Sequence, residues 1–82
     1  MSYKVYILEC SDKTLYTGIA LDVNKRLIEH NTSDKGAKYT RVRRPVRLVY
    51  TEEAEDRSSA CKREYAIKQL TRVQKLKLIG NN

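Results

Sequence analysis

The sequence predicts an α+β fold in which helices flank a three-stranded antiparallel sheet and the elements follow in the order β-β-α-β-α-α. Residues 3–9, 14–19 and 46–50 are rich in β-branched and aromatic side chains, as strands are. The segments between and after them carry helix-capping residues and apolar residues at helical spacing. With 82 residues the chain has room for one small core, so we predict a single domain over residues 1–82.

The first two strands are expected to form a hairpin with residues 11–13 as its loop. This register pairs Tyr6 with Gly18 and places Tyr6 and Tyr16 on the same face. A two-residue loop would separate the two phenols. The last residue of a three-residue loop usually adopts the left-handed conformation, which falls here on Lys13.

Asp22 predicts the start of the first helix, because an aspartate side chain can accept a hydrogen bond from a free backbone N–H at a helix start. Val23 and Leu27 are four residues apart and form the apolar pair that faces the core. Arg26 and His30 form a second such pair beside the first. We therefore expect both polar side chains at the margin of the buried stripe.

Residues 32–44 show no periodicity and predict a loop, closed by Pro45 ahead of the third strand. Acidic residues within 52–56 predict the start of a second helix, because negative charge is favourable at a helix N-terminus. This helix should end near residue 70, with its apolar positions at Ala60, Cys61, Ile67 and Leu70.

The segment from Thr71 to Gln74 has the spacing of a capping box and predicts a final helix that Gly80 ends. Asn81 and Asn82 should fray beyond it. The expected core positions of this helix are Val73, Leu76 and Ile79.

The chain has 17 Lys and Arg against 10 Asp and Glu, a net charge of +7 that favours polyanionic partners, although a basic surface can also serve solubility alone. No apolar run can span a bilayer and no signal peptide is evident, so we expect a cytoplasmic protein without a membrane partner. Cys10, Cys61 and the single histidine, His30, cannot supply the four ligands of a structural zinc site. Both thiols should be reduced core residues.

A run of basic residues without any acid lies between residues 35 and 47. Such side chains can neutralise phosphates while a tyrosine ring offers a stacking face, so the run predicts a nucleic-acid contact, with a solvated loop as the alternative. The candidate nucleic-acid-binding residues are Lys35, Lys38, Tyr39, Arg41, Arg43, Arg44 and Arg47.

Glu64 shares a helix face with Ala60 and Ile67, which is a costly place for a carboxylate. It should therefore have a cationic partner, a metal or an edge position open to water. An ion pair to Lys68 or Arg63 is the structural alternative to a functional role.

Several short segments combine the residues singled out above, namely Lys4-Val5-Tyr6, Leu15-Tyr16-Thr17-Gly18, Arg26, His30-Asn31, Gly36 to Arg41 and Lys62 to Tyr65. Their order and spacing resemble the signature of the GIY-YIG nucleases, and especially the small bacterial branch that consists of this domain alone. Two positions depart from that signature, since Lys4 stands in place of Gly and Thr17 in place of Ile. A late Asn of many relatives has no match, because Asn81 and Asn82 follow the last predicted helix.

The resemblance implies a metal-dependent cut of a DNA phosphodiester that leaves a 5′-phosphate, with one Mg²⁺ or Mn²⁺ ion held by Glu64. Arg26 would then stabilise phosphate charge, and Tyr6 would help to deprotonate the attacking water. Tyr16 and His30 would orient that water and the phenols, and Gly18 would allow a tight backbone turn.

The identity of the base stays open between two side chains. A tyrosine pKa near 10 makes phenolate at pH 7 cost about 4 kcal/mol, so Tyr6 needs help from a cation or from His30. The ordinary pKa of histidine, about 6.5, suits general-base work better.

We therefore expect an endonuclease acting on DNA, with structured or repair-associated DNA as candidate substrates and Tyr6, Tyr16, Arg26, His30 and Glu64 as catalytic residues. The first alternative is a nucleic-acid-binding module that does not turn over, or acts only beside a partner protein. A protein-interaction module is the second, and it would lack a salt-sensitive affinity for DNA.

Overall fold

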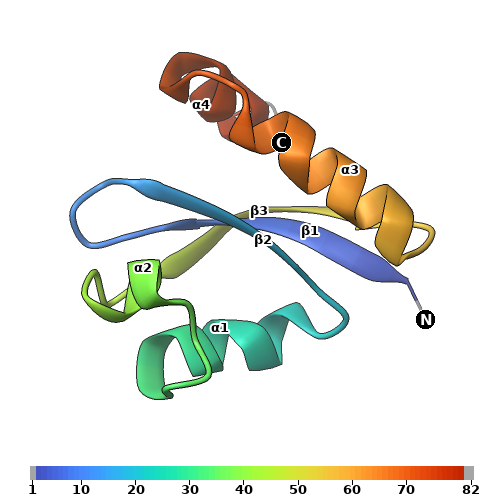
Figure 1. Ribbon diagram of the computed structural model, residues 1–82. Helices are drawn as coiled ribbons and strands as arrows, with labels where there is room; N and C mark the ends of the chain where they lie inside the picture. Colours follow the sequence, from blue (N-terminus) through green and yellow to red (C-terminus); the bar gives the residue numbers. More distant parts are fainter. Residues whose placement is uncertain (1, 81–82) are drawn as a thin grey trace.

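A three-stranded antiparallel sheet separates two pairs of helices in the computed structural model, which describes residues 2–80 (Figure 1). The predicted α+β fold is confirmed, with β1 in the centre of the strand order β2-β1-β3. Asn81 and Asn82, predicted to fray, lie outside the described residues. The elements are β1 (Tyr3–Glu9), β2 (Leu15–Ala20), α1 (Val23–Thr32), α2 (Lys38–Arg41), β3 (Arg47–Ala54), α3 (Arg57–Lys68) and α4 (Arg72–Gly80).

The β1–β2 hairpin has the predicted register, with Tyr6 opposite Gly18. Lys13 ends the loop in the left-handed conformation, at φ 70°. The Asp12 carboxylate accepts hydrogen bonds from the Thr14 backbone N–H at 3.1 Å and from its hydroxyl, which fixes the turn. Tyr6 and Tyr16 therefore share one face of the hairpin, as the three-residue loop requires.

Successive side chains of β1 point to opposite faces of the sheet, so the core consists of two layers. Tyr6 and Leu8 face α1 and pack with Cys10, Val23 and Val46. On the other face of the sheet, the core consists of Val5, Ile7, Ala60 and Ile67. Figure 1 shows the same arrangement, with α1 and α2 on one side of the sheet and α3 and α4 on the other.

The segment 32–44, predicted as a loop, contains the short helix α2. Its four residues are too few to show a 3.6-residue period, which explains the wrong prediction. The segment is held against the end of α1 by Arg44, which donates to the carbonyls of His30 at 2.6 Å and Ser33 at 2.7 Å. Asn31 adds two hydrogen bonds to the backbone of Val46.

The third strand is longer than predicted, because β3 continues to Ala54. Glu52 lies within this strand, where it accepts hydrogen bonds from Tyr50 at 2.6 Å and Arg63 at 2.7 Å. The helix predicted after the acidic segment is confirmed as α3, and Asp56 caps it by accepting from the backbone N–H of Ser59. Strand pairing therefore sets where β3 ends, and the last acidic residue of the segment marks the helix start.

The capping box of α4 is confirmed, since Thr71 and Gln74 exchange hydrogen bonds at 2.9 and 3.2 Å. Three predicted core positions are wrong, because Cys61, Val73 and Leu76 are exposed. Ile79 packs against the second core layer as predicted, and Leu78, which was not predicted, packs there as well.

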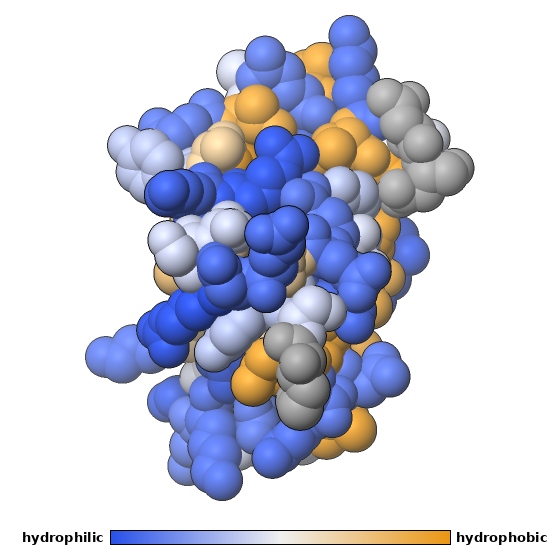
Figure 2. Space-filling model, turned by 90° about the vertical axis from the view of Figure 1, so that its right-hand side faces the viewer, coloured by the Kyte–Doolittle hydropathy of each residue, from blue (hydrophilic) through white to orange (hydrophobic). Residues whose placement is uncertain are grey.

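None of the helices in the described part of the chain combines the length and apolarity that a bilayer crossing requires. The face shown in Figure 2 is largely hydrophilic, with apolar atoms in separate small groups.

Replacing Gly36 with alanine should destabilise the fold. The added Cβ would lie 2.8 Å from the Cα of His30 and 2.9 Å from the carbonyl oxygen of Glu29, and neither backbone atom can move freely. We expect urea unfolding to show a loss of about 1–3 kcal/mol. Gly80→Ala is the matched control, because its Cβ would meet no atom within 4 Å and alanine favours a helix. Equal stability of the two variants would contradict the close packing of this loop on α1.

Candidate active site

The site begins with a buried hydrogen bond between the Tyr6 hydroxyl and His30 Nε2, at 2.8 Å. Tyr6 comes from the central strand β1 and is 1% exposed, whereas His30 comes from the last turn of α1. Gly18 leaves room for the phenol, because a Cβ there would lie 2.5 Å from the Tyr6 hydroxyl oxygen. Gly18 lies within β2 without a positive φ, so its role is to provide space and not, as predicted, to form a turn.

The imidazole of His30 is fully buried and has a partner at each nitrogen. Its Nδ1 lies 2.8 Å from the Thr40 hydroxyl of α2, opposite the bond to Tyr6. The ring of Tyr16 meets it edge-on, with centroids 5.2 Å apart. Side chains from the hairpin, α1 and α2 thus meet at His30. The structure places Tyr6, Tyr16 and His30 in contact, as the predicted hairpin register and helix pairing require.

Burial keeps both hydrogen-bonded groups neutral at pH 7. It raises the pKa of Tyr6 to about 12, with Tyr16 and Glu64 acting in the same direction and Arg26 against it. It also lowers the pKa of His30 to about 4, assisted by the positive charges of Arg26 and Arg44 and opposed by Glu29. A neutral phenol therefore faces a neutral imidazole.

Arg26 lies at the margin of this cluster, where the sequence placed it, with 29% of its side chain exposed. Its Nη1 donates to Glu29 at 3.1 Å and to the carbonyl of Lys35 at 2.7 Å. These bonds fix the guanidinium beside Tyr6, whose pKa it lowers. Arg26 can therefore present positive charge next to the phenol without side-chain rearrangement.

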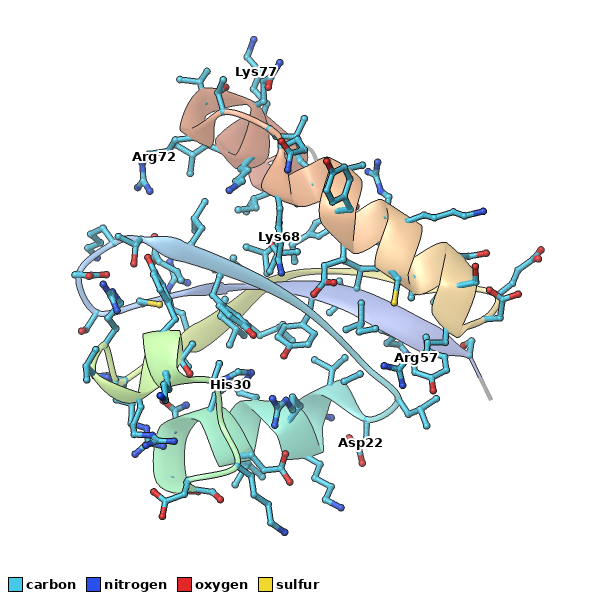
Figure 3. All side chains as sticks on the ribbon, in the orientation of Figure 1. Asp22, His30, Arg57, Lys68, Arg72 and Lys77 are labelled. Atoms are coloured by element: carbon cyan, nitrogen blue, oxygen red, sulfur yellow. The ribbon has the colours of Figure 1, made fainter. Side chains whose placement is uncertain are left out.

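Glu64 approaches the site from α3, on the opposite layer. Its carboxylate is 23% exposed and pairs with Lys68 at 3.4 Å, one of the two structural partners that the sequence suggested. Arg63 pairs with Glu52 instead. Glu64 also acts electrostatically on Tyr6, and Lys68 lines a groove together with Tyr16. Figure 3 shows Lys68 directed from α3 toward the sheet, which His30 approaches from α1.

Glu64 fits a metal held mainly by substrate and water. Within residues 2–80, no three His, Cys, Asp or Glu side chains gather to form a complete metal site. Mg²⁺ commonly takes only one or two protein carboxylates and completes its shell with water and phosphate oxygens. The partly exposed carboxylate of Glu64 can serve as such a ligand. Its ion pair with Lys68 is long, at 3.4 Å, so a metal ion can replace the ammonium group at low cost.

The basic run divides into two groups in the structure. Arg43 and Arg47 form ion pairs with Asp12 and Glu9, and Arg44 binds the end of α1. Lys35, Lys38 and Arg41 are exposed outside these contacts, and Arg47 is exposed despite its ion pair. Arg41 also donates to the Asp34 carbonyl at 3.1 Å.

Tyr39 connects this basic surface with the buried cluster. Its ring stacks on Tyr16, with centroids 6.0 Å apart and the planes at 25°, and the guanidinium of Arg43 lies 3.9 Å from its centre. The ring is 37% exposed. A side chain from the predicted nucleic-acid-binding run therefore touches a predicted catalytic tyrosine.

The sequence reasoning missed Thr40, the second partner of His30. A threonine in a segment without periodicity carries no signal for such a role. Only the fold of α2 back onto α1 reveals it.

Comparison with known proteins agrees with this geometry. Residues 2–77 match the family model described as the GIY-YIG catalytic domain. UPF0213 protein DP2720 of Desulfotalea psychrophila is 60% identical over 75 residues, covering 92% of this chain and 68% of that protein. UPF0213 protein SERP0126 of Staphylococcus epidermidis is 61% identical over 75 residues, covering 92% and 90%.

A solved structure extends the likeness to three dimensions. The solution NMR structure of UPF0213 protein BH0048 from Bacillus halodurans is 45% identical, with a TM-score of 0.64 over 100% of this chain and 86% of that one. The chain belongs to the GIY-YIG family, and its relatives are the small stand-alone UPF0213 proteins. The resemblance inferred from the motifs is confirmed, and with it a nuclease-type fold.

Acidification should destabilise the protein through His30. The unfolded chain binds a proton there below about pH 6.5 and the folded protein only below about pH 4, so the unfolded state gains protons first. We expect the free energy of unfolding to fall by about 3 kcal/mol between pH 7 and pH 4 from this residue. Urea titrations of the wild type and His30→Gln measure it. The variant should lose this part of the pH dependence, and identical slopes would contradict a buried neutral imidazole.

Proposed function

We propose that this protein is a metal-dependent endonuclease that hydrolyses DNA phosphodiester bonds. The observation that supports it most is the buried Tyr6–His30 hydrogen bond, with Arg26 and Tyr16 beside it and Glu64 within electrostatic reach. Tyr6 and His30 can pass a proton between them, Arg26 carries positive charge that can face a phosphate, and Glu64 offers an oxygen ligand for a divalent metal. Membership of the GIY-YIG family supports a nucleic-acid phosphodiester as the substrate class.

The pKa values decide how the attacking water can lose its proton. A free Tyr6 phenolate at pH 7, with the pKa at about 12, would cost about 7 kcal/mol. An imidazolium at His30, with the pKa at about 4, costs about 4 kcal/mol. The cheaper route passes the water proton to the Tyr6 oxygen while the phenol proton moves to His30 Nε2, so that Tyr6 stays neutral throughout.

The remaining residues act on the phosphate. The water oxygen forms its bond to phosphorus as the bond from phosphorus to the 3′-oxygen breaks, which leaves a 5′-phosphate and a 3′-hydroxyl whose proton comes from solvent. Arg26 offsets the negative charge that develops there. A divalent ion such as Mg²⁺ or Mn²⁺, held by Glu64 with water and substrate, would supply further positive charge. The exposed Lys35, Lys38 and Arg41 would neutralise flanking phosphates.

A nucleic-acid-binding module that does not cut, or cuts only beside a partner protein, is the alternative. The pairing of Glu64 with Lys68 favours it, because an ammonium already occupies the carboxylate that a metal would need. The two functions share the basic surface and differ in turnover.

Glu64→Gln should abolish metal-dependent cleavage while leaving the fold intact. Loss of one carboxylate ligand removes several kcal/mol of transition-state stabilisation, so we expect a rate at least about 100-fold lower. Nicking of plasmid and structured DNA with Mg²⁺ or Mn²⁺ measures it.

Glu55→Gln, an exposed carboxylate between β3 and α3, is the matched control and should cut at the wild-type rate. Full activity of Glu64→Gln would refute its role. Salt-sensitive DNA binding by a wild type that does not cut would favour the binding module.

A further inference from the structure

Thr40 is a buried polar residue that the proposed catalytic set does not include. It lies in α2, is fully buried, and its neighbours Tyr39 and Arg41 point to the exposed basic surface. Its hydroxyl oxygen has two partners, His30 Nδ1 at 2.8 Å and the carbonyl oxygen of Ala37 at 2.9 Å. The hydroxyl group has one proton, so it can donate to only one of these two partners.

The positions of the protons follow from these distances. Two oxygens 2.9 Å apart need a proton between them, and a carbonyl can only accept, so the Thr40 hydroxyl donates to Ala37. The hydroxyl then has only lone pairs left for His30, which makes Nδ1 the donor. A neutral imidazole carries one N–H, so Nε2 is the acceptor and the Tyr6 hydroxyl donates to it.

We propose that Thr40 is a positioning residue that holds His30 in the Nδ1–H tautomer, so that His30 Nε2 can accept the Tyr6 proton and the phenol oxygen can accept one from water. This inference rests on the proposed nuclease function. In the opposite tautomer the Nε2–H would donate to the phenol oxygen, and the path from Tyr6 to His30 would be closed.

The surroundings of Thr40 keep this arrangement rigid. Arg44 binds the carbonyls of His30 and Ser33, and Gly36 allows the loop backbone to approach His30 closely. The charged groups that act on the imidazole are Arg26, Glu29 and Arg44, none of which is hydrogen-bonded to a ring nitrogen. The tautomer is therefore selected by the two hydrogen bonds alone.

Nitrogen-15 NMR of the imidazole tests the proposal directly, because His30 is the only histidine in the chain. At pH 7 the wild type should show a protonated, pyrrole-type Nδ1 and an unprotonated, pyridine-type Nε2. Thr40→Val keeps the side-chain shape but removes the acceptor, so the proton should move to Nε2. Thr40→Ser should retain the wild-type pattern, and Thr51→Val on the exposed part of β3 is the matched control.

DNA cleavage rates test whether the tautomer matters for the proposed reaction. Thr40→Val should cut DNA about 10- to 100-fold more slowly, with its Kd for DNA unchanged within about twofold, and Thr40→Ser should restore the rate. An Nε2–H tautomer in the wild type, an unchanged tautomer in Thr40→Val, or a changed tautomer with full cleavage would each overturn the proposal. If the wild type shows no Glu64-dependent cleavage, the nuclease function fails, while the wild-type and Thr40→Val spectra still decide whether Thr40 sets the tautomer.

Discussion

The hydrogen bond between Tyr6 and His30 is the constraint on which the rest of the site depends. It lies in the core layer between β1 and α1, where an unpaired phenol or imidazole would cost about 1–3 kcal/mol. Three features of the fold serve it. Gly18 leaves space for the phenol, Thr40 occupies the other nitrogen, and Arg44 ties the loop to the end of α1. Part of the small core of this domain is therefore a polar hydrogen-bond network, an arrangement that is more typical of functional sites than of purely structural cores.

The two helical layers contribute different chemistry. The α1 and α2 side holds the buried hydrogen bonds of His30 to Tyr6 and Thr40, whereas α3 carries Glu64, a carboxylate that is partly exposed and paired with Lys68. The groove lined by Tyr16 and Lys68 connects the layers across β2. Under the proposed function, the residues that would transfer protons are fixed before substrate binds, and the carboxylate that would bind a cation is partly exposed.

Much of the fold was predictable because its signals are local. Loop length set the register of the hairpin, and side-chain caps at Asp22 and Thr71 marked two helices. The wrong predictions have two causes. Helix α2 is too short to show a period. Tertiary contacts decide the others, since β3 extends to Ala54 through Glu52, which pairs with Arg63, and α4 packs on the sheet through Leu78 and Ile79. The candidate site residues were predicted from their resemblance to the GIY-YIG signature, whereas Thr40 has no spacing signal and is identified only by its packing against His30.

In the proposed mechanism, Tyr6 and His30 together take the proton from the attacking water. Single-turnover cleavage by Tyr6→Phe, which removes one oxygen atom and keeps the ring, measures this role. With Mg²⁺ or Mn²⁺ and saturating DNA, we expect the rate to fall by about 100-fold or more while DNA affinity and the folded structure are retained. Cleavage by Tyr6→Phe at the wild-type rate would contradict it.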